Sequence, residues 1–186
     1  MRSLIITVAG MATRFNKDLQ SPILKCLYND NQPTHSLLAQ IIFKAQAFDQ
    51  IIIVGGYLFD ELREYVNNVF IDFSDRITLV YNPLYREYGS GYSLMKGIEA
   101  LDPDCDEVVF AEGDLFFDSD SFQKIVHAAN DVLTVTPDPI RADKAVVFYT
   151  DLSESTICMI FLIHTWRSKN RSAQFIIPGR SGNLRM

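Results

Sequence analysis

Strand-like and helix-like segments alternate along this chain. Apolar runs rich in β-branched residues predict buried strands at residues 3–8, 50–54, 77–81 and 107–111. Apolar residues at helical spacing predict helices within residues 35–48, 59–69, 92–101 and 122–129. Asp120 or Ser121 is the expected N-cap of the last of these helices. The pattern therefore predicts strands and helices in regular turn over the first two thirds of the chain.

Such alternation favours an α/β fold, a Rossmann-like and mostly parallel sheet with helices on both faces. Ligands of these sheets bind at the carboxyl ends of the strands, and Gly10 and Asp114 both follow a predicted strand end. Further strands are expected at residues 132–136, 145–149 and 156–163.

Charge and cysteine usage narrow the function classes. The net charge of −6 argues against nucleic acid as the partner, since phosphate backbones need a basic surface. The cysteines are scattered and form no Cys-x-x-Cys motif, which argues against a disulfide framework and a structural zinc site. Without a signal-like start or a long apolar run, we expect a cytoplasmic protein that does not insert into membranes.

The last residues depart from the pattern. We assign residues 1–155 to one domain and 156–186 to an atypical basic segment, which carries no Asp or Glu. The run 156–163 is apolar enough to complete the sheet or to bind a partner chain. Beyond about Trp166 no amphipathic period is present, so we expect loose packing, early proteolysis and no metal ligand there.

The segment that follows the first predicted strand carries the strongest chemical signal. It reads Ala9-Gly10-Met11-Ala12-Thr13-Arg14-Phe15, with Lys25 one loop further on. Small residues let backbone N–H groups approach a phosphate, and two cations complete such a cradle. The segment therefore predicts a nucleoside-triphosphate site. The alternative is a strand-to-helix turn with two surface cations.

Ala-Gly-x-x-Thr-Arg-Phe with a downstream lysine resembles the signature loop of the nucleoside-triphosphate transferases. These include sugar-phosphate nucleotidyltransferases and the phosphocholine cytidylyltransferases of bacterial surface synthesis. The resemblance implies a fold of the nucleotide-diphospho-sugar transferase type, with residues 9–13 binding nucleotide and Arg14 and Lys25 acting as catalytic cations. One departure is Ala12, where the family usually has glycine, because alanine does not favour a positive φ.

The end of the strand at 107–111 resembles the family's metal site. Its residues are Glu112-Gly113-Asp114, and the resemblance implies that the Asp114 carboxylate holds a catalytic Mg²⁺, a hard cation that prefers oxygen ligands. Glu112 shares its face and is a weaker candidate ligand. The alternatives are a turn aspartate and a partly exposed strand-end acid. No acid follows Glu154, so the family's second metal ligand has no candidate, and the basic segment is incomplete relative to the family.

The tyrosine-rich segment 81–93 resembles the base-binding loop of the phosphocholine cytidylyltransferase branch. It contains Tyr-Asn-x-x-Tyr-Arg-Glu-Tyr, then the candidate nucleotide-binding residues Gly89, Ser90, Gly91 and Ser93. The alternative is a flexible loop in which Ser90 is a helix N-cap.

These features predict a Mg²⁺-dependent nucleotidyltransferase. It would move a nucleoside monophosphate from a nucleoside triphosphate, with CTP favoured, to a small phosphorylated acceptor such as phosphocholine, and release pyrophosphate. Such an acceptor phosphate is mostly ionised at neutral pH, so no catalytic base is required. A sugar-1-phosphate nucleotidyltransferase, a glycosyltransferase of related fold and a non-catalytic nucleotide-binding module remain as alternatives, and the oligomeric state, including a homodimer, is open.

Overall fold

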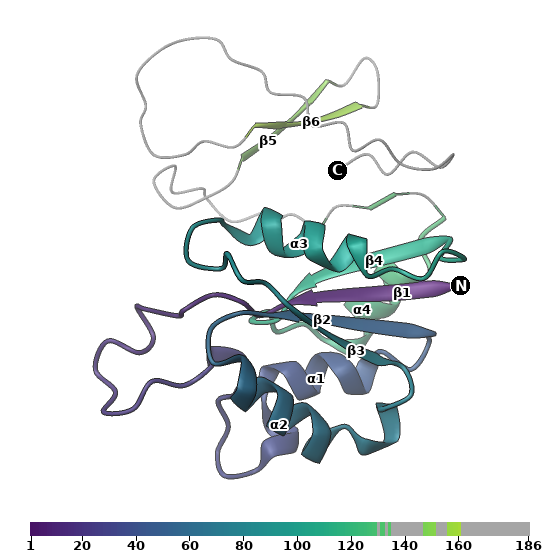
Figure 1. Cartoon of the computed structure of the whole chain (residues 1–186). Coiled ribbons are helices and arrows are strands. Elements are labelled where there is room, and N and C mark those ends of the chain that lie inside the picture. The colour runs from purple at the N-terminus through teal and green to yellow at the C-terminus, as the bar shows by residue number, and fades with distance from the viewer. Residues whose placement is uncertain (130, 133, 135–146, 152–155, 161–186) are drawn as a thin grey trace, which may run out of the picture. The chain divides into compact units, whose positions relative to one another are not determined.

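The computed structural model describes residues 1–129, 131, 132, 134, 147–151 and 156–160, and the chain divides into two compact units, Met1–Val126 and His127–Met186. The first unit holds a four-stranded parallel sheet in the order β3-β2-β1-β4 (Figure 1). Its strands are β1 (Arg2–Thr7), β2 (Gln50–Gly55), β3 (Ile77–Tyr81) and β4 (Glu107–Glu112). The predicted Rossmann-like α/β fold is confirmed, with each of these strands within one residue of its expected bounds.

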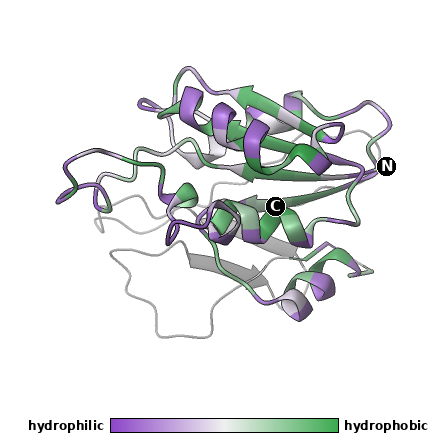
Figure 2. Ribbon diagram, turned by 90° about the horizontal axis from the view of Figure 1, so that it is seen from below, coloured by the Kyte–Doolittle hydropathy of each residue, from purple (hydrophilic) through white to green (hydrophobic). Residues whose placement is uncertain are grey.

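Helices cover both faces of this sheet, as predicted. They are α1 (Leu37–Lys44), α2 (Phe59–Val69), α3 (Ser90–Glu99) and α4 (Ser119–Val126), with 3-10 turns at Lys25–Leu27, Pro33–His35 and Ile71–Phe73. Figure 1 shows α3 on one face and α1 and α2 on the other. Alternate strand residues point to opposite faces, so Leu4 and Ile6 join the core with Leu38 and Phe122, whereas Ile5 faces α3. The strands are accordingly hydrophobic along their length (Figure 2).

The helix α4 begins earlier and ends earlier than its pattern predicted. Asp118 is its N-cap: one carboxylate oxygen accepts a hydrogen bond from the Ser121 backbone N–H at 2.8 Å, and the other accepts from the Ser121 hydroxyl at 2.7 Å. The expectation that Asp120 or Ser121 caps the helix was therefore wrong, because Ser121 stands three residues further on and donates to the cap. The helix ends at Val126, short of Ala129.

The second unit contains a separate two-stranded antiparallel sheet. It pairs β5 (Val147–Asp151) with β6 (Thr156–Ile160). The run 156–163 thus pairs with β5 and does not complete the parallel sheet. Val132 and Thr134 lie outside any strand, which corrects the strand expected at 132–136 where it is described. The proposed boundary at residue 155 and the expectations for the chain beyond Trp166 fall outside the described residues and stay predictions.

In the part of the chain that the structure describes, no helix has the length and apolar character needed to cross a membrane.

Close packing of α3 on the sheet depends on Gly97, which yields a stability prediction. A Cβ at Gly97 would lie 2.5 Å from Ile5 Cγ2 and 3.3 Å from Val54 Cγ2. We expect Gly97→Ala to lower the free energy of unfolding by about 1–3 kcal/mol, as overpacked cores do. The matched control is Gly91→Ala in the same helix, where a Cβ meets nothing within 4 Å. Urea titrations that show equal stability for both variants would contradict this packing.

Candidate functional site

The carboxyl ends of β1, β2 and β4 are level with one another. Thr7 pairs in register with Val54 on one side and Glu112 on the other. Just beyond, the Gly113 N–H donates to the Thr7 carbonyl at 2.9 Å. A Cβ at Gly113 would lie 2.2 Å from Val8 Cγ1, so only glycine allows this approach. The turn after β4 therefore begins directly beside the loop after β1.

An ion pair joins these two segments. Lys25 Nζ donates to Asp114 Oδ2 at 2.8 Å, and the two side chains are 42% and 45% exposed. The flanking Leu24 and Cys26 are buried in the core, which directs the Lys25 side chain outward. Two residues that lie 89 positions apart in sequence, the predicted catalytic lysine and the predicted metal ligand, are thus brought together.

Cys26 beside this ion pair is a core residue. It is buried, and burial raises the pKa of its thiol to about 12. A thiol in that environment stays neutral and is not a nucleophile.

Glu112 adds a second carboxylate next to Asp114. Desolvation raises the pKa of Glu112, the negative charge of Asp114 raises it further, and Lys25 opposes the shift. The repulsion between the two carboxylates shows that they share one environment, which a cation would relieve. Among the described residues no group of three or more His, Cys, Asp or Glu side chains is arranged to hold a metal. This donor set fits Mg²⁺, which often takes one or two protein carboxylates and completes its shell with water and substrate phosphates.

The loop after β1 has the backbone conformation of a glycine-containing loop at Ala12. Its φ is 47°, in the left-handed region, and its carbonyl accepts a hydrogen bond from the Asn16 N–H at 2.9 Å. Alanine thus occupies the conformation for which glycine is better suited, and the departure from the family pattern does not change the path of the chain. Thr13 and Arg14 are exposed, and no hydrogen bond or ion pair joins Arg14 to Lys25 or Asp114.

Ala12 gives a second stability prediction. Placing an L-residue in the left-handed region costs about 1–2 kcal/mol, while the added freedom of glycine in the unfolded chain costs about 0.4–1 kcal/mol. We expect Ala12→Gly to raise the free energy of unfolding by up to about 1 kcal/mol, and the β-branched Ala12→Val to lower it by about 1–3 kcal/mol. Denaturant unfolding of both variants tests this; a Val variant as stable as the Gly variant would exclude the left-handed conformation.

Three glycines of the predicted site are explained neither by packing nor by backbone conformation. A Cβ added to Gly10, Gly89 or Gly91 would meet nothing within 4 Å, and none of them has a positive φ. Gly55, Gly56, Gly97 and Gly113, in contrast, are each in contact with a neighbouring side chain that a Cβ would meet. Open space above a glycine backbone is what the close approach of a ligand requires.

The tyrosine-rich segment leads into α3. Gly89 is the N-cap and Ser90 the first helical residue, so the alternative role of Ser90 as N-cap is wrong. Ser93 is buried, and its hydroxyl accepts a hydrogen bond from the fully buried Asn82 amide at 2.9 Å. That bond fastens the segment to the helix, and a direct contact between Ser93 and a nucleotide base stays a prediction. No described contact joins residues 89–93 to Lys25 or Asp114.

Aromatic rings gather along this segment. Tyr85 packs against Gly56, where a Cβ would lie 2.5 Å from Tyr85 Cβ, and its ring centroid is 6.3 Å from that of Tyr57. Tyr88 and Tyr92 are stacked with centroids 5.1 Å apart. The segment therefore presents several aromatic faces, which attract cationic groups.

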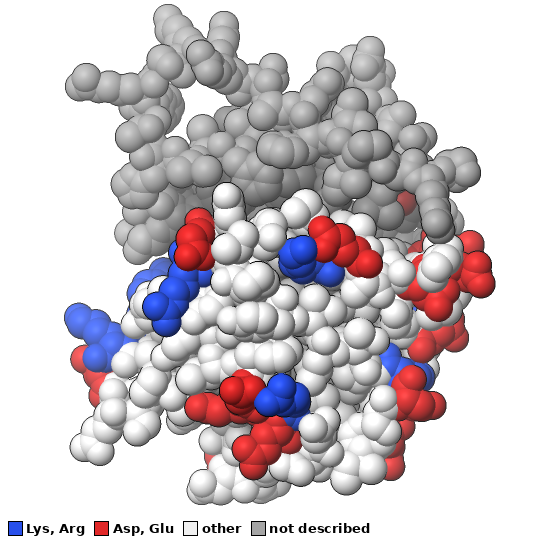
Figure 3. All heavy atoms as spheres, in the orientation of Figure 1, with Lys and Arg blue, Asp and Glu red and all other residues white. Residues whose placement is uncertain are grey.

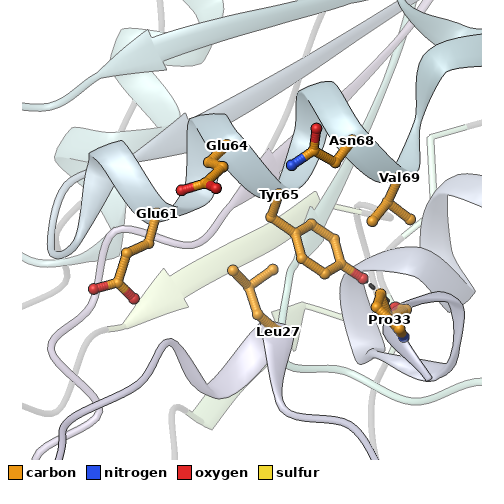
Figure 4. A pocket seen from close by; sticks show the side chains of 7 residues that line it. All are labelled: Leu27, Pro33, Glu61, Glu64, Tyr65, Asn68 and Val69. Carbon is orange, nitrogen blue, oxygen red and sulfur yellow. Dashed lines mark hydrogen bonds between the residues drawn. The ribbon is translucent and has the colours of Figure 1, made fainter. Parts of the chain in front are cut away.

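Two other surface features do not coincide with the predicted site. A groove of about 340 Å³ runs between α2 and the first two 3-10 turns, lined by Leu27, Pro33, Glu61, Glu64, Tyr65, Asn68 and Val69 (Figure 4). None of the predicted site residues lines it. On the face drawn in Figure 3, acidic and basic side chains of the described residues are intermixed.

Comparison with known proteins gives a family and a set of relatives. The family described as "Domain of unknown function (DUF6564)" matches residues 21–167. The chain is 40% identical over 90 residues to the choline-phosphate cytidylyltransferase of Haemophilus influenzae, a match that covers 48% of this chain and 35% of that protein. The resemblance to nucleotidyltransferases near the phosphocholine cytidylyltransferase branch is thereby confirmed.

Solved structures share the fold. The inositol-1-phosphate CTP transferase of T. maritima superposes with a TM-score of 0.56 at 16% identity, over 70% of this chain and 50% of that one. The 4-diphosphocytidyl-2C-methyl-D-erythritol synthase of Anaerococcus prevotii gives 0.53 at 20% identity, over 86% and 62%. This chain therefore spans about a third of its curated relative and between half and two thirds of these two structures.

Proposed function

The chain belongs to the family of the domain of unknown function DUF6564, and we propose that it transfers a nucleoside monophosphate from a nucleoside triphosphate to a small phosphorylated acceptor. One observation carries the proposal: the Lys25–Asp114 pair, with Nζ and Oδ2 2.8 Å apart, lies where the open loop after β1 meets the end of β4. A cation, a carboxylate and free backbone N–H groups at one strand edge are the groups that a triphosphate and its metal ion need.

The reaction would depend on charge and position. The acceptor phosphate attacks the α-phosphorus, the bond to the β-phosphate breaks, and pyrophosphate leaves. Lys25 releases Asp114 and pairs with a phosphate oxygen, while Arg14 offers its planar guanidinium to the outer phosphates. Residues 9–13 direct backbone N–H groups to the same oxygens. Asp114, with Glu112 beside it, would hold Mg²⁺, which when bound neutralises charge on the transferring phosphate.

The acceptor follows from chemistry and kinship. The curated relative is named for choline phosphate, and one structural neighbour for CTP. The aromatic faces of Tyr57, Tyr85, Tyr88 and Tyr92 suit a quaternary ammonium group by cation–π attraction. We therefore propose CTP as the donor and phosphocholine or a similar amino-alcohol phosphate as the acceptor.

One assay tests the proposal and separates it from the alternatives. The protein is incubated with Mg²⁺, each of the four nucleoside triphosphates and either phosphocholine or a sugar 1-phosphate, and pyrophosphate is measured. We expect release with CTP that depends on phosphocholine. Release with a sugar 1-phosphate alone would change the acceptor. Turnover of a nucleotide-sugar without pyrophosphate, or triphosphate binding without any turnover, would overturn the proposal.

A further inference from the structure

Asn16 connects the two halves of the loop after β1. Its Nδ2 donates to the Met11 carbonyl at 3.2 Å and to the Ile23 carbonyl at 3.0 Å, and its Oδ1 accepts from the Ile23 N–H at 3.0 Å. Its backbone N–H also donates to the Ala12 carbonyl. The side chain is partly buried. A single amide thus binds the phosphate-facing half of the loop and the segment that leads to Lys25.

The contact with Ile23 has two points and therefore fixes orientation as well as distance. The amide pairs with both the N–H and the carbonyl of that residue, as a neighbouring strand would. Among neutral side chains only an amide offers a donor and an acceptor in one plane. Residues 17–22 between the two halves are all exposed, so no buried side chain of that stretch anchors it.

The position of Ile23 determines where Lys25 begins. Only Leu24 separates them; it is 2% exposed, and it is the N-cap of the 3-10 turn that starts at Lys25. Asn16 and this buried leucine hold the chain on both sides of the Ile23–Leu24 peptide. The start of the Lys25 side chain is in this way set relative to Met11 and Ala12, which lie in the predicted phosphate cradle.

We propose that Asn16 is a positioning residue that holds Lys25 at the correct distance from the loop after β1. This inference rests on the proposed function, because it assigns Lys25 a triphosphate oxygen as its partner. It predicts that loss of Asn16 acts through Lys25: the fold persists, while the ammonium group is no longer set for a phosphate.

The positioning is tested first without any nucleotide. In Asn16→Ala and in the near-isosteric Asn16→Leu, we expect the Ile23 amide to exchange with deuterium at least tenfold faster. We expect trace acetylation of Lys25, read by mass spectrometry against Lys17, to become severalfold faster. The matched control is Asn29→Ala, a partly buried asparagine with one amide hydrogen bond, to the Leu27 carbonyl. Unchanged exchange and labelling in both Asn16 variants would overturn the proposal.

A double-mutant cycle then tests whether Asn16 acts through Lys25. With MgCTP as the probe, we expect Asn16→Ala to weaken binding about tenfold in the parent and less than twofold in a Lys25→Ala background. Equal losses in both backgrounds would show that Asn16 does not act through Lys25 and would overturn the inference. If the parent binds no triphosphate, the proposed function fails, whereas exchange and labelling still decide whether Asn16 positions Lys25.

Discussion

Asp114→Asn should reduce pyrophosphate release by about 100-fold or more, which corresponds to about 2.7 kcal/mol of transition-state stabilisation. The substitution keeps the shape of the side chain and removes the charge that a divalent cation requires. It also removes the Lys25 partner, but that pair is nearly half exposed, so the thermal midpoint should change little. Binding of nucleotide in the presence of Mg²⁺ should fall at least tenfold, while binding in EDTA should stay within about twofold of the parent.

The control for Asp114 is Asp120→Asn, an exposed aspartate in the first turn of α4. It changes the net charge equally and should leave both activity and Mg²⁺ dependence unchanged. Identical Mg²⁺ titration curves for Asp114→Asn and the parent would show that Asp114 is only a turn residue. That result would leave the fold assignment intact and remove the metal from the proposed mechanism.

Lys25→Ala and Arg14→Ala should each weaken triphosphate use by about 2–3 kcal/mol, a loss of roughly 30- to 150-fold, typical of charge-assisted hydrogen bonds. Both side chains are at least partly exposed and lie outside the core, so the thermal midpoint should move little. Kinetics over a range of CTP concentrations measure the effect, and Lys17→Ala, an exposed lysine of the same loop, is the control.

The two cations should also differ from each other. Lys25→Arg keeps the charge, but its planar group is a poor match for a site that holds a point charge at 2.8 Å from a carboxylate, so we expect incomplete rescue. If Arg14→Ala and Lys25→Ala both bind every triphosphate as the parent does, the loop after β1 is a structural turn and the phosphate cradle does not exist.

The strands and the site edge could be predicted because their causes are local or topological. Buried parallel strands are continuous β-branched runs, and the runs at 3–8 and 50–54 contain little else. Once the sheet is parallel, residues that follow strand ends meet at one edge, which is why Asp114 was found near the loop after β1.

Other features have causes that a pattern does not contain. Lys25 and Asp114 meet only because Gly113 packs on Val8, a contact between distant segments. Asn16 gave no signal, since an asparagine among polar loop residues is expected in any turn. The cap of α4 was misplaced because Asp118, Asp120 and Ser121 are all good N-caps, and the choice between them depends on where the chain leaves β4.

The Lys25–Asp114 pair has a consequence for the order in which partners arrive. In the free protein the lysine ammonium occupies the carboxylate oxygen that a divalent cation would need, so lysine and metal compete for it. An incoming triphosphate gives the ammonium another anion and brings its own cation, and the competition ends. We therefore expect free Mn²⁺, followed by electron paramagnetic resonance, to bind weakly until nucleotide is added. Lys25→Met should remove this dependence on nucleotide, so that the protein alone retains the ion. The lysine would thus serve as an internal counter-ion that keeps the site closed to the bare metal and opens it to the metal–nucleotide complex.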